Sequence, residues 1–297
     1  MIVASWLWAI FTVIAAAAQT ARNALQRSLV ERIGTIGATQ VRFLYGFPFA
    51  LLFLAIVDVL VPGPSLPLSW RFAGWVVVGG LAQILATALM LSAMRDRSFM
   101  VTTAYTKTEP VIVALFGVFI LGDHLTALAW IAIAVATAGI LVMSWKPGAP
   151  GGARPAVLGI ASAAMFGLAA TGFRGAILSL QADSFVLAAT TTLVWGLGFQ
   201  ALVLSLYLAI ADRKALRAII AAWRPSLLAG FSGAFASQFW FLAFAIEAAA
   251  KVRTLALIEV LFAGLVSGAI MKQVTSPRDG AGIALIVIGV AVLLLWA

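Results

Sequence analysis

The chain has no cysteine and only one histidine, His124, among its 297 residues. Without cysteine there is no disulfide, no thiol nucleophile and no thiolate-ligated metal. One histidine is too few for a histidine-based zinc site. The phosphate-binding pattern G-x-x-x-x-G-K-[ST] and the hydrolase patterns G-x-S-x-G and H-E-x-x-H are also missing. These absences predict no catalytic residue, no metal and no cofactor, and they exclude direct use of ATP by this chain.

Charge is scarce as well. Only 10% of the residues are charged and 64% are hydrophobic, with a mean hydropathy of +1.12, whereas soluble domains carry about one-quarter charged residues. The net charge of +9 comes from basic residues scattered between apolar runs, without a basic stripe interleaved with aromatics. We therefore predict an integral membrane protein that contacts lipids and a small-molecule substrate, and no nucleic acid.

Ten apolar runs are long enough to cross a hydrocarbon core about 30 Å thick, which takes about 20 helical residues. The first, from residue 2 to 21, lacks a basic leader and a cleavage site and is interpreted as a span rather than a signal peptide. The connections leave no room for a soluble domain, so the fold class is an all-α membrane protein. The expected spans are 2–22, 36–58, 71–94, 98–121, 125–145, 155–180, 184–211, 225–247, 252–271 and 278–297.

A repeat divides the chain near its Pro- and Gly-rich midpoint, "KPGAPGGARP". A shift of 150 residues lays Glu109 on Glu259 and Gly139 on Gly289. The predicted domains are two five-helix repeats, 1–150 and 151–297. Because five is odd, the second repeat enters the membrane from the opposite side, which is the inverted-repeat design of many secondary transporters.

Basic residues predict the orientation. Loops after the odd-numbered spans hold thirteen lysines and arginines, Arg22 among them, and the alternate loops hold three: Arg71, Lys251 and Arg253. By the positive-inside rule the richer side is cytoplasmic and both termini lie outside. The expected location is the inner (plasma) membrane, as a multi-pass protein.

Glu109 and Glu259 fall well inside spans 98–121 and 252–271, and Glu109 falls close to the midplane. An intramembrane carboxylate tends to mark a substrate or proton pathway. The alternative is a structural ion pair, with Arg42 or Lys107 neutralising Glu109. The sequence leaves both readings open, because a common ancestor copies a structural residue as readily as a functional one.

Other polar and aromatic residues fall within the spans. Glutamines there can serve as glue between helices, and aromatics can face lipid or the core. Taken together they suggest a polar-lined cavity suited to an amphipathic or aromatic solute. The candidate substrate-binding residues are Gln19, Arg42, Tyr45, Gln83, Glu109, Trp195, Gln238, Trp240 and Glu259.

The segment 108–143, "TEPVIVALFGVFILGDHLTALAWIAIAVATAGILVM", resembles the hallmark of the drug/metabolite transporter superfamily, in its EamA-like ten-helix branch. Glu109-Pro110 matches the Glu-Pro that opens an apolar helix, and "LGD" stands where the family has Leu-Gly-Glu. Arg42, in "TQVRFLYGFPFALL", matches the arginine found early in the second helix. The second repeat departs further, since Glu259-Val260 lacks the proline.

The resemblance implies a secondary transporter that exports amino acids or other small metabolites by alternating access. The alternative from another class is an integral-membrane lipid-modifying enzyme. Family members are often drawn with both termini in the cytoplasm, opposite to the charge count. "GLVSG" at 264–268 permits close helix packing, within the chain or between two copies, so a monomer or a weak homo-oligomer is expected.

Overall fold

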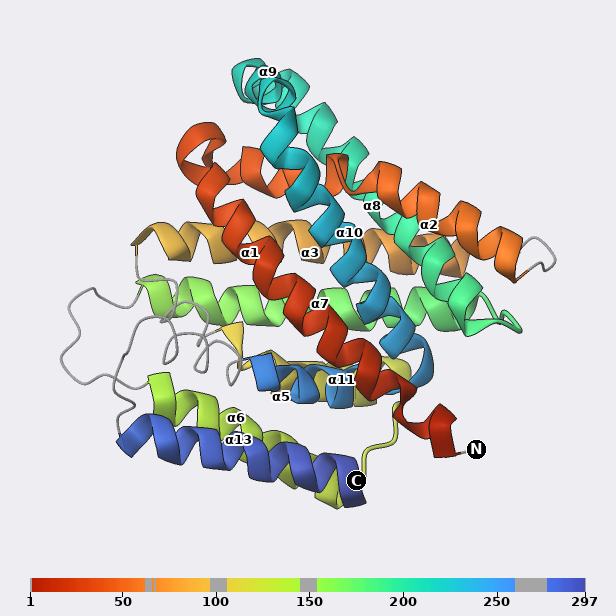
Figure 1. Cartoon of the computed structure of the whole chain (residues 1–297), viewed down its shortest axis with the longest axis vertical. Coiled ribbons are helices and arrows are strands. Elements are labelled where there is room, and N and C mark those ends of the chain that lie inside the picture. The colour runs from red at the N-terminus through yellow and green to blue at the C-terminus, as the bar shows by residue number, and fades with distance from the viewer. Residues whose placement is uncertain are drawn as a thin grey trace.

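The computed structural model describes residues 2–61, 66, 68–96, 106–144, 154–259 and 277–296, and every regular element in these ranges is a helix (Figure 1). Helices satisfy their backbone hydrogen bonds internally, as an apolar bilayer requires. In chain order the elements are α1 (Ile2–Leu44), α2 (Phe47–Leu60), α3 (Trp70–Asp96), α5 (Glu109–Phe116), the π-helix η1 (Gly117–Leu121), α6 (Ala127–Ser144), α7 (Arg154–Ser179), α8 (Phe185–Ala211), α9 (Arg213–Ala221), α10 (Trp223–Ile246), α11 (Ala249–Leu255), the 3-10 helix η2 (Ala256–Ile258) and α13 (Pro277–Trp296).

The first two expected spans are joined in one long element. The segment between 22 and 36, which the sequence suggested as a loop, is helical except at Gly34. Gly34 has φ 73° and ψ 173°, a backbone conformation that glycine adopts without a steric penalty. The helix axis reverses there, and Figure 1 shows α1 turning back toward α2. The boundary prediction was wrong because helical propensity continues through both arms of the hairpin.

Five helical segments have the length and hydropathy of membrane spans. They are Ser28–Leu60, Trp70–Ala93, Val157–Ser179, Phe185–Ala211 and Trp223–Ile246. Three shorter apolar helices accompany them, Glu109–Leu121, Ala127–Met143 and Gly280–Trp296. These helices support the prediction of a multi-pass all-α membrane protein. Parts of the expected spans 98–121 and 252–271, together with "GLVSG" at 264–268, lie outside the described residues.

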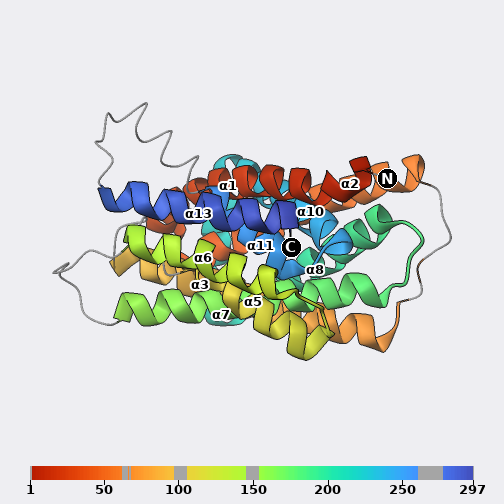
Figure 2. The ribbon, with the colours of Figure 1, turned by 90° about the horizontal axis from the view of Figure 1, so that it is seen from below.

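Helices distant in sequence pack in pairs. α3 lies along α7, α1 crosses α10, α2 contacts α8, α5 contacts α11, and α6 lies along α13 (Figures 1 and 2). Small residues bring some of these pairs close: a Cβ on Gly230 of α10 would lie 2.5 Å from the backbone carbon of Tyr45. The close approach of α10 to the end of α1 therefore depends on a residue without a side chain.

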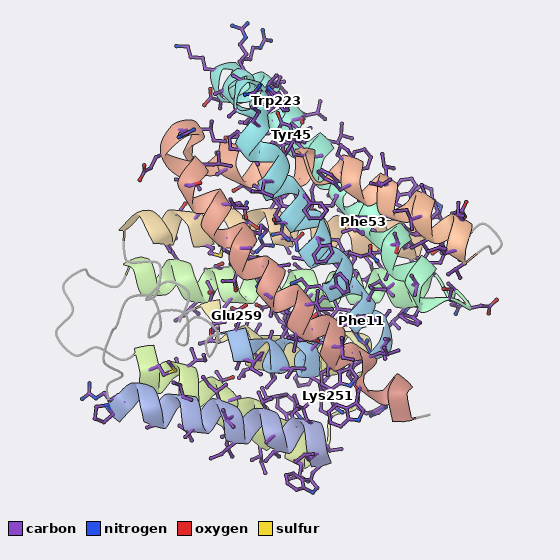
Figure 3. All side chains as sticks on the ribbon, in the orientation of Figure 1. Phe11, Tyr45, Phe53, Trp223, Lys251 and Glu259 are labelled. Atoms are coloured by element: carbon purple, nitrogen blue, oxygen red, sulfur yellow. The ribbon has the colours of Figure 1, made fainter. Side chains whose placement is uncertain are left out.

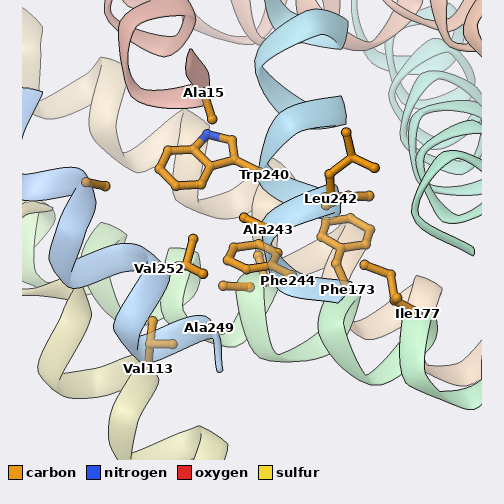
Figure 4. Close-up of a cluster of buried hydrophobic side chains, with 14 of the residues drawn as sticks. Ala15, Val113, Phe173, Ile177, Trp240, Leu242, Ala243, Phe244, Ala249 and Val252 are labelled. Atoms are coloured by element: carbon orange, nitrogen blue, oxygen red, sulfur yellow. The ribbon is translucent and has the colours of Figure 1, made fainter. Parts of the chain in front are cut away.

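The apolar core extends through most of the bundle, and part of it lies where α5, α7, α10 and α11 meet. Trp240, Phe244 and Phe173 gather there with smaller residues such as Val252 and Val113, all of them buried (Figure 4). Phe173 and Phe241 have ring centroids 4.7 Å apart. This core forms one wall of the polar centre described next.

Candidate functional site

Glu109 stands in the first turn of α5, with 8% of its surface exposed. Pro110 follows at the second helical position, where its missing N–H breaks no helical hydrogen bond, so the Glu-Pro pair opens the helix. The carboxylate also lies favourably near the positive end of the helix dipole. Its Oε1 is 3.0 Å from Nε of Arg253 in α11, which is 7% exposed. Glu109 is thus half of a buried ion pair between α5 and α11.

A second ion pair joins the same two segments. Lys107, in the turn before α5, pairs through Nζ with Oε1 of Glu259, which directly follows η2. Figure 3 shows Glu259 beside the start of α5. Both residues are buried. Each side of the contact between α5 and the α11–η2 segment therefore contributes one cation and one carboxylate, and we call these four residues, Lys107, Glu109, Arg253 and Glu259, the crossed ion pairs.

Of the two predicted partners of Glu109, Arg42 was wrong, whereas Lys107 does interact with the charge of Glu109. Arg42 donates instead to the hydroxyl of Thr87, at 3.3 Å, and to that of Ser237, at 3.4 Å. The end of α1 carries Arg42 between α3 and α10, away from the start of α5. The ion pair that Lys107 forms is with Glu259. Arg253 is the partner of Glu109 because α5 packs on α11. The spacing of residues along the sequence does not reveal that contact.

Two buried arginines lie beside the crossed ion pairs. Arg22 is 1% exposed and donates to the side-chain oxygen of its neighbour Asn23, from Nε at 3.2 Å and from a terminal nitrogen at 2.7 Å. Arg42 is 2% exposed. The other terminal nitrogen of Arg22 and the Nε of Arg42 are buried and have no hydrogen-bond partner among the described residues. Both stems pass Gly233 of α10, where an added Cβ would lie 3.1 Å from Cγ of Arg42 and 3.5 Å from Cδ of Arg22.

Two small adjoining cavities open among these groups. The first has about 20 Å³ and the second about 10 Å³ of space for the centre of a water molecule, so each has room for about one water. They share Gln19, Phe166 and Arg253. Arg22, Lys107 and Glu109 line the first, and Arg42, Gln83 and Trp240 line the second. The described conformation is closed to a metabolite-sized solute.

Trp240 and Gln19 connect the cavities to the core. The Arg253 guanidinium lies over the Trp240 ring, 4.2 Å from its centroid. A guanidinium stacked on an aromatic face gains cation–π attraction. The indole N–H of Trp240 donates to the side-chain oxygen of Gln19 at 3.1 Å. The position of Arg253 is thus fixed from two sides, by Glu109 and by Trp240.

The structure separates the predicted substrate-binding residues into two groups. Gln19, Arg42, Gln83, Glu109 and Trp240 line the cavities, and Glu259 supports them through Lys107. Their role in binding a substrate stays a prediction.

The other predicted residues lie elsewhere. Trp195 is 49% exposed on α8, with its ring edge-on to Phe72, so its expected place in the cavity lining was wrong. Tyr45 donates from its hydroxyl to the backbone oxygen of Ile219, at 3.0 Å, and does not line either cavity. Gln238 donates to Thr190 at 2.8 Å, as glue between α10 and α8.

The candidate binding residues left out two central arginines, which stand at the edges of the expected spans 2–22 and 252–271. Arg253 and Arg22 were both counted for membrane orientation, yet both are buried beside the cavities. Removing one from each side leaves 13 − 1 = 12 basic residues against 3 − 1 = 2, so the charge bias survives. A signal was present for Arg253, which stands in the apolar stretch "VRTLALIEV" six residues before Glu259.

Arg174 of α7 forms a separate junction at one end of the bundle. It pairs with Asp123 of the "LGD" turn, with 3.2 Å between nitrogen and oxygen, and donates to the backbone oxygens of Phe244 and Glu247. Those oxygens are at the end of α10, where helical carbonyls lack internal partners. Arg174 thus ties the turn after η1 to the end of α10.

A comparison of the sequence with known protein families finds a match. Residues 5–145 match the model of the EamA-like transporter family. Residues 5–145 belong to the EamA-like transporter family. The match contains Arg42, Glu109-Pro110 and the "LGD" turn, so the resemblance inferred from the segment 108–143 is confirmed. Proteins of this family are transporters of the drug/metabolite type rather than enzymes.

A likeness in fold extends over the whole chain. A protein known from a crystal structure aligns with 99% of this chain and 99% of its own, with a TM-score of 0.69 and 17% identity. At that identity the likeness shows the fold alone. No curated protein matches the chain in sequence.

Proposed function

We propose that this protein is a secondary active transporter that exports amino acids or similar small metabolites across the inner membrane by alternating access. The observation that carries the proposal is the pair of crossed ion pairs beside two cavities at the centre of the bundle. Buried charges in a membrane protein are costly and tend to mark the path of a solute or ion. The EamA-like match of residues 5–145 supports transport over membrane enzymology.

We further propose that residues 1–150 and 151–297 form two inverted repeats. In the expected helix numbering, α1 with α10, α3 with α7, and α5 with α11 pair helix 1 with 8, 3 with 6, and 4 with 9. Exchanging the two halves turns the 1–8 pair into the 6–3 pair and returns the 4–9 pair to itself. The packing is therefore consistent with a pseudo-two-fold axis in the membrane plane.

The crossed ion pairs have a mechanical role in this proposal. Lys107 and Glu109 belong to the first repeat, and Arg253 and Glu259 belong to the second. The two ion pairs hold the first repeat against the second at the level of the cavities. Opening toward either side of the membrane rearranges helices around this charged junction while its charges keep partners, because a stranded buried charge is strongly destabilising.

Transport can be tested with purified protein in proteoliposomes loaded with labelled amino acids under an imposed proton or sodium gradient. We expect flux that protein-free vesicles lack. As a matched pair, Gly233→Leu fills the space beside Arg22 and Arg42 and should abolish flux, whereas Gly74→Ala, at a position with nothing within 4 Å of an added Cβ, should leave it unchanged. Absence of gradient-driven flux for every amino acid, together with lipid turnover in the same vesicles, would favour the enzyme instead.

A further inference from the structure

The polar centre carries an excess of positive charge. Arg22, Arg42, Lys107 and Arg253 supply four cations, and Glu109 and Glu259 supply two carboxylates. The crossed ion pairs use one cation for each carboxylate. Among the described side chains, Arg22 and Arg42 donate to neutral oxygens, those of Asn23, Thr87 and Ser237.

The rest of the chain offers these two arginines little compensation. The chain has ten acidic residues, and the segments outside the described ranges contain none of them. Asp123 is paired with Arg174, and the Glu247 carboxylate accepts from the Ala248 N–H. Glu31, Asp58, Asp183 and Asp212 are exposed. The two remaining acids, Asp96 and Asp279, stand at the end of α3 and in the first turn of α13.

Burying a guanidinium without a countercharge is strongly destabilising, so two of them at adjoining cavities call for an anionic partner. Each still has a buried N–H with no acceptor among the described residues. Arg22 faces the first cavity and Arg42 the second, and the cavities meet at Gln19 and Arg253. Arginine presents a planar fork of donors that matches carboxylate and phosphate oxygens.

We propose that Arg22 and Arg42 form a binding site for a small organic metabolite with two anionic groups, a dicarboxylate or a phosphate ester, which neutralises the excess charge of the centre. This inference rests on the proposed transport function and narrows its substrate class. It adds two negative charges to the expected amphipathic solute, because Arg22 and Arg42 line the cavities beside aromatic residues such as Trp240.

The two cavities as described are too small for such a metabolite, so binding requires the wall to widen. The four members of the crossed ion pairs neutralise one another and can stay paired. The contacts described for Arg22 and Arg42 are weaker: long or local hydrogen bonds to hydroxyl and amide groups and, for Arg42, a position over the neighbouring Phe43 ring. A ligand that binds Arg22 and Arg42 therefore breaks weaker contacts than one that binds Lys107 or Arg253.

The test measures binding to the full chain, purified in detergent, by calorimetry and by ligand-induced shift of the melting temperature. The probes are succinate for two carboxylates, inorganic phosphate for a compact dianion, and leucine for a zwitterion of the same size class. We expect succinate or phosphate to bind and leucine not to bind. Arg22→Gln and Arg42→Gln should each weaken that binding by about 10- to 100-fold, as expected for loss of hydrogen bonds to a charged group.

Arg71→Gln is the matched control, since it removes the same charge from an exposed position on α3 and should leave affinity unchanged. A second readout separates binding from structure. Without ligand, Arg22→Gln and Arg42→Gln should melt no lower than the parent protein, because each removes an uncompensated cation. If either variant fails to fold, the corresponding lysine variant keeps the charge without the fork and should bind the anion more weakly than the parent.

Each outcome decides the proposal. Binding of succinate alone assigns a dicarboxylate, and binding of phosphate alone assigns a phosphate ester. Binding of leucine alone, binding of none of the three probes, or equal losses in Arg71→Gln and the two cavity variants would overturn it. The proposed function is judged separately by flux. Leucine transport without anion binding would support transport and contradict the anion site. Anion binding without any flux would support the anion site and contradict transport.

Discussion

The sharpest test of the polar centre is Glu109→Gln. The substitution keeps the shape of the side chain and removes its charge, so Arg253 loses its countercharge while 7% exposed. Removing one partner of a buried ion pair costs about 3–5 kcal/mol. The glutamine oxygen can still accept from the guanidinium, a hydrogen bond worth about 1 kcal/mol, which reduces the loss. The stack of Arg253 on Trp240 is kept in both proteins and does not change the difference.

The expected net loss is therefore about 2–4 kcal/mol. For a chain of this size, about 2–4 °C of melting temperature correspond to 1 kcal/mol, so we expect a drop of roughly 4–16 °C. The measurement is thermal unfolding of the detergent-solubilised protein, followed by intrinsic tryptophan fluorescence. Glu31→Gln makes the same chemical change at an exposed position on α1. It should change the free energy of unfolding by less than about 0.5 kcal/mol.

One result would refute the reasoning: Glu109→Gln and Glu31→Gln melting together with the parent protein. The ion pair would then contribute nothing to stability. If flux driven by an ion gradient were lost while stability and binding were kept, Glu109 would act in coupling rather than in holding α5 against α11.

Three further predictions follow from other parts of the fold. Asp123→Asn should lower stability by about 1–2 kcal/mol, since it removes one charge-assisted bond from Arg174; unchanged thermal unfolding would contradict this. Gly230→Val should sharply reduce folded yield in size-exclusion chromatography, because its Cβ meets the Tyr45 backbone at 2.5 Å, and a monodisperse variant would disprove that packing. A periplasmic reporter fused after Ala297 should be active by the charge bias of twelve to two, and a cytoplasmic reporter active in its place would reverse the orientation.

Apolar run length was enough to predict most helices. The expected spans 71–94, 155–180, 184–211 and 225–247 each agree with α3, α7, α8 and α10 to within a few residues at either end. A bilayer leaves an apolar segment no alternative to internal hydrogen bonding, so composition decides the element. Local composition could not locate the reversal in α1, because it depends on the positive φ of Gly34 rather than on a polar break.

The EamA-like family was likewise readable from one segment, 108–143, since the Glu-Pro start of α5 and the "LGD" turn are local features. The sequence also marked Glu109 and Glu259 as unusual, because any carboxylate inside an apolar run is unusual wherever its partner lies. Composition and local pattern thus determined the class of protein, its helices and the position of its costly charges.

Only the tertiary structure decided which charges meet. Arg253 looked like a loop residue and proved to be the partner of Glu109. Arg42 looked like that partner and proved to contact only neutral hydroxyl groups among the described polar side chains. Ion pairing depends on the distance between two charges. That distance is set by which helices pack together, and the spacing of residues along the chain does not give it. Whether a buried arginine is neutralised or left with excess charge is therefore settled by packing, and the chemistry of the cavity follows from that.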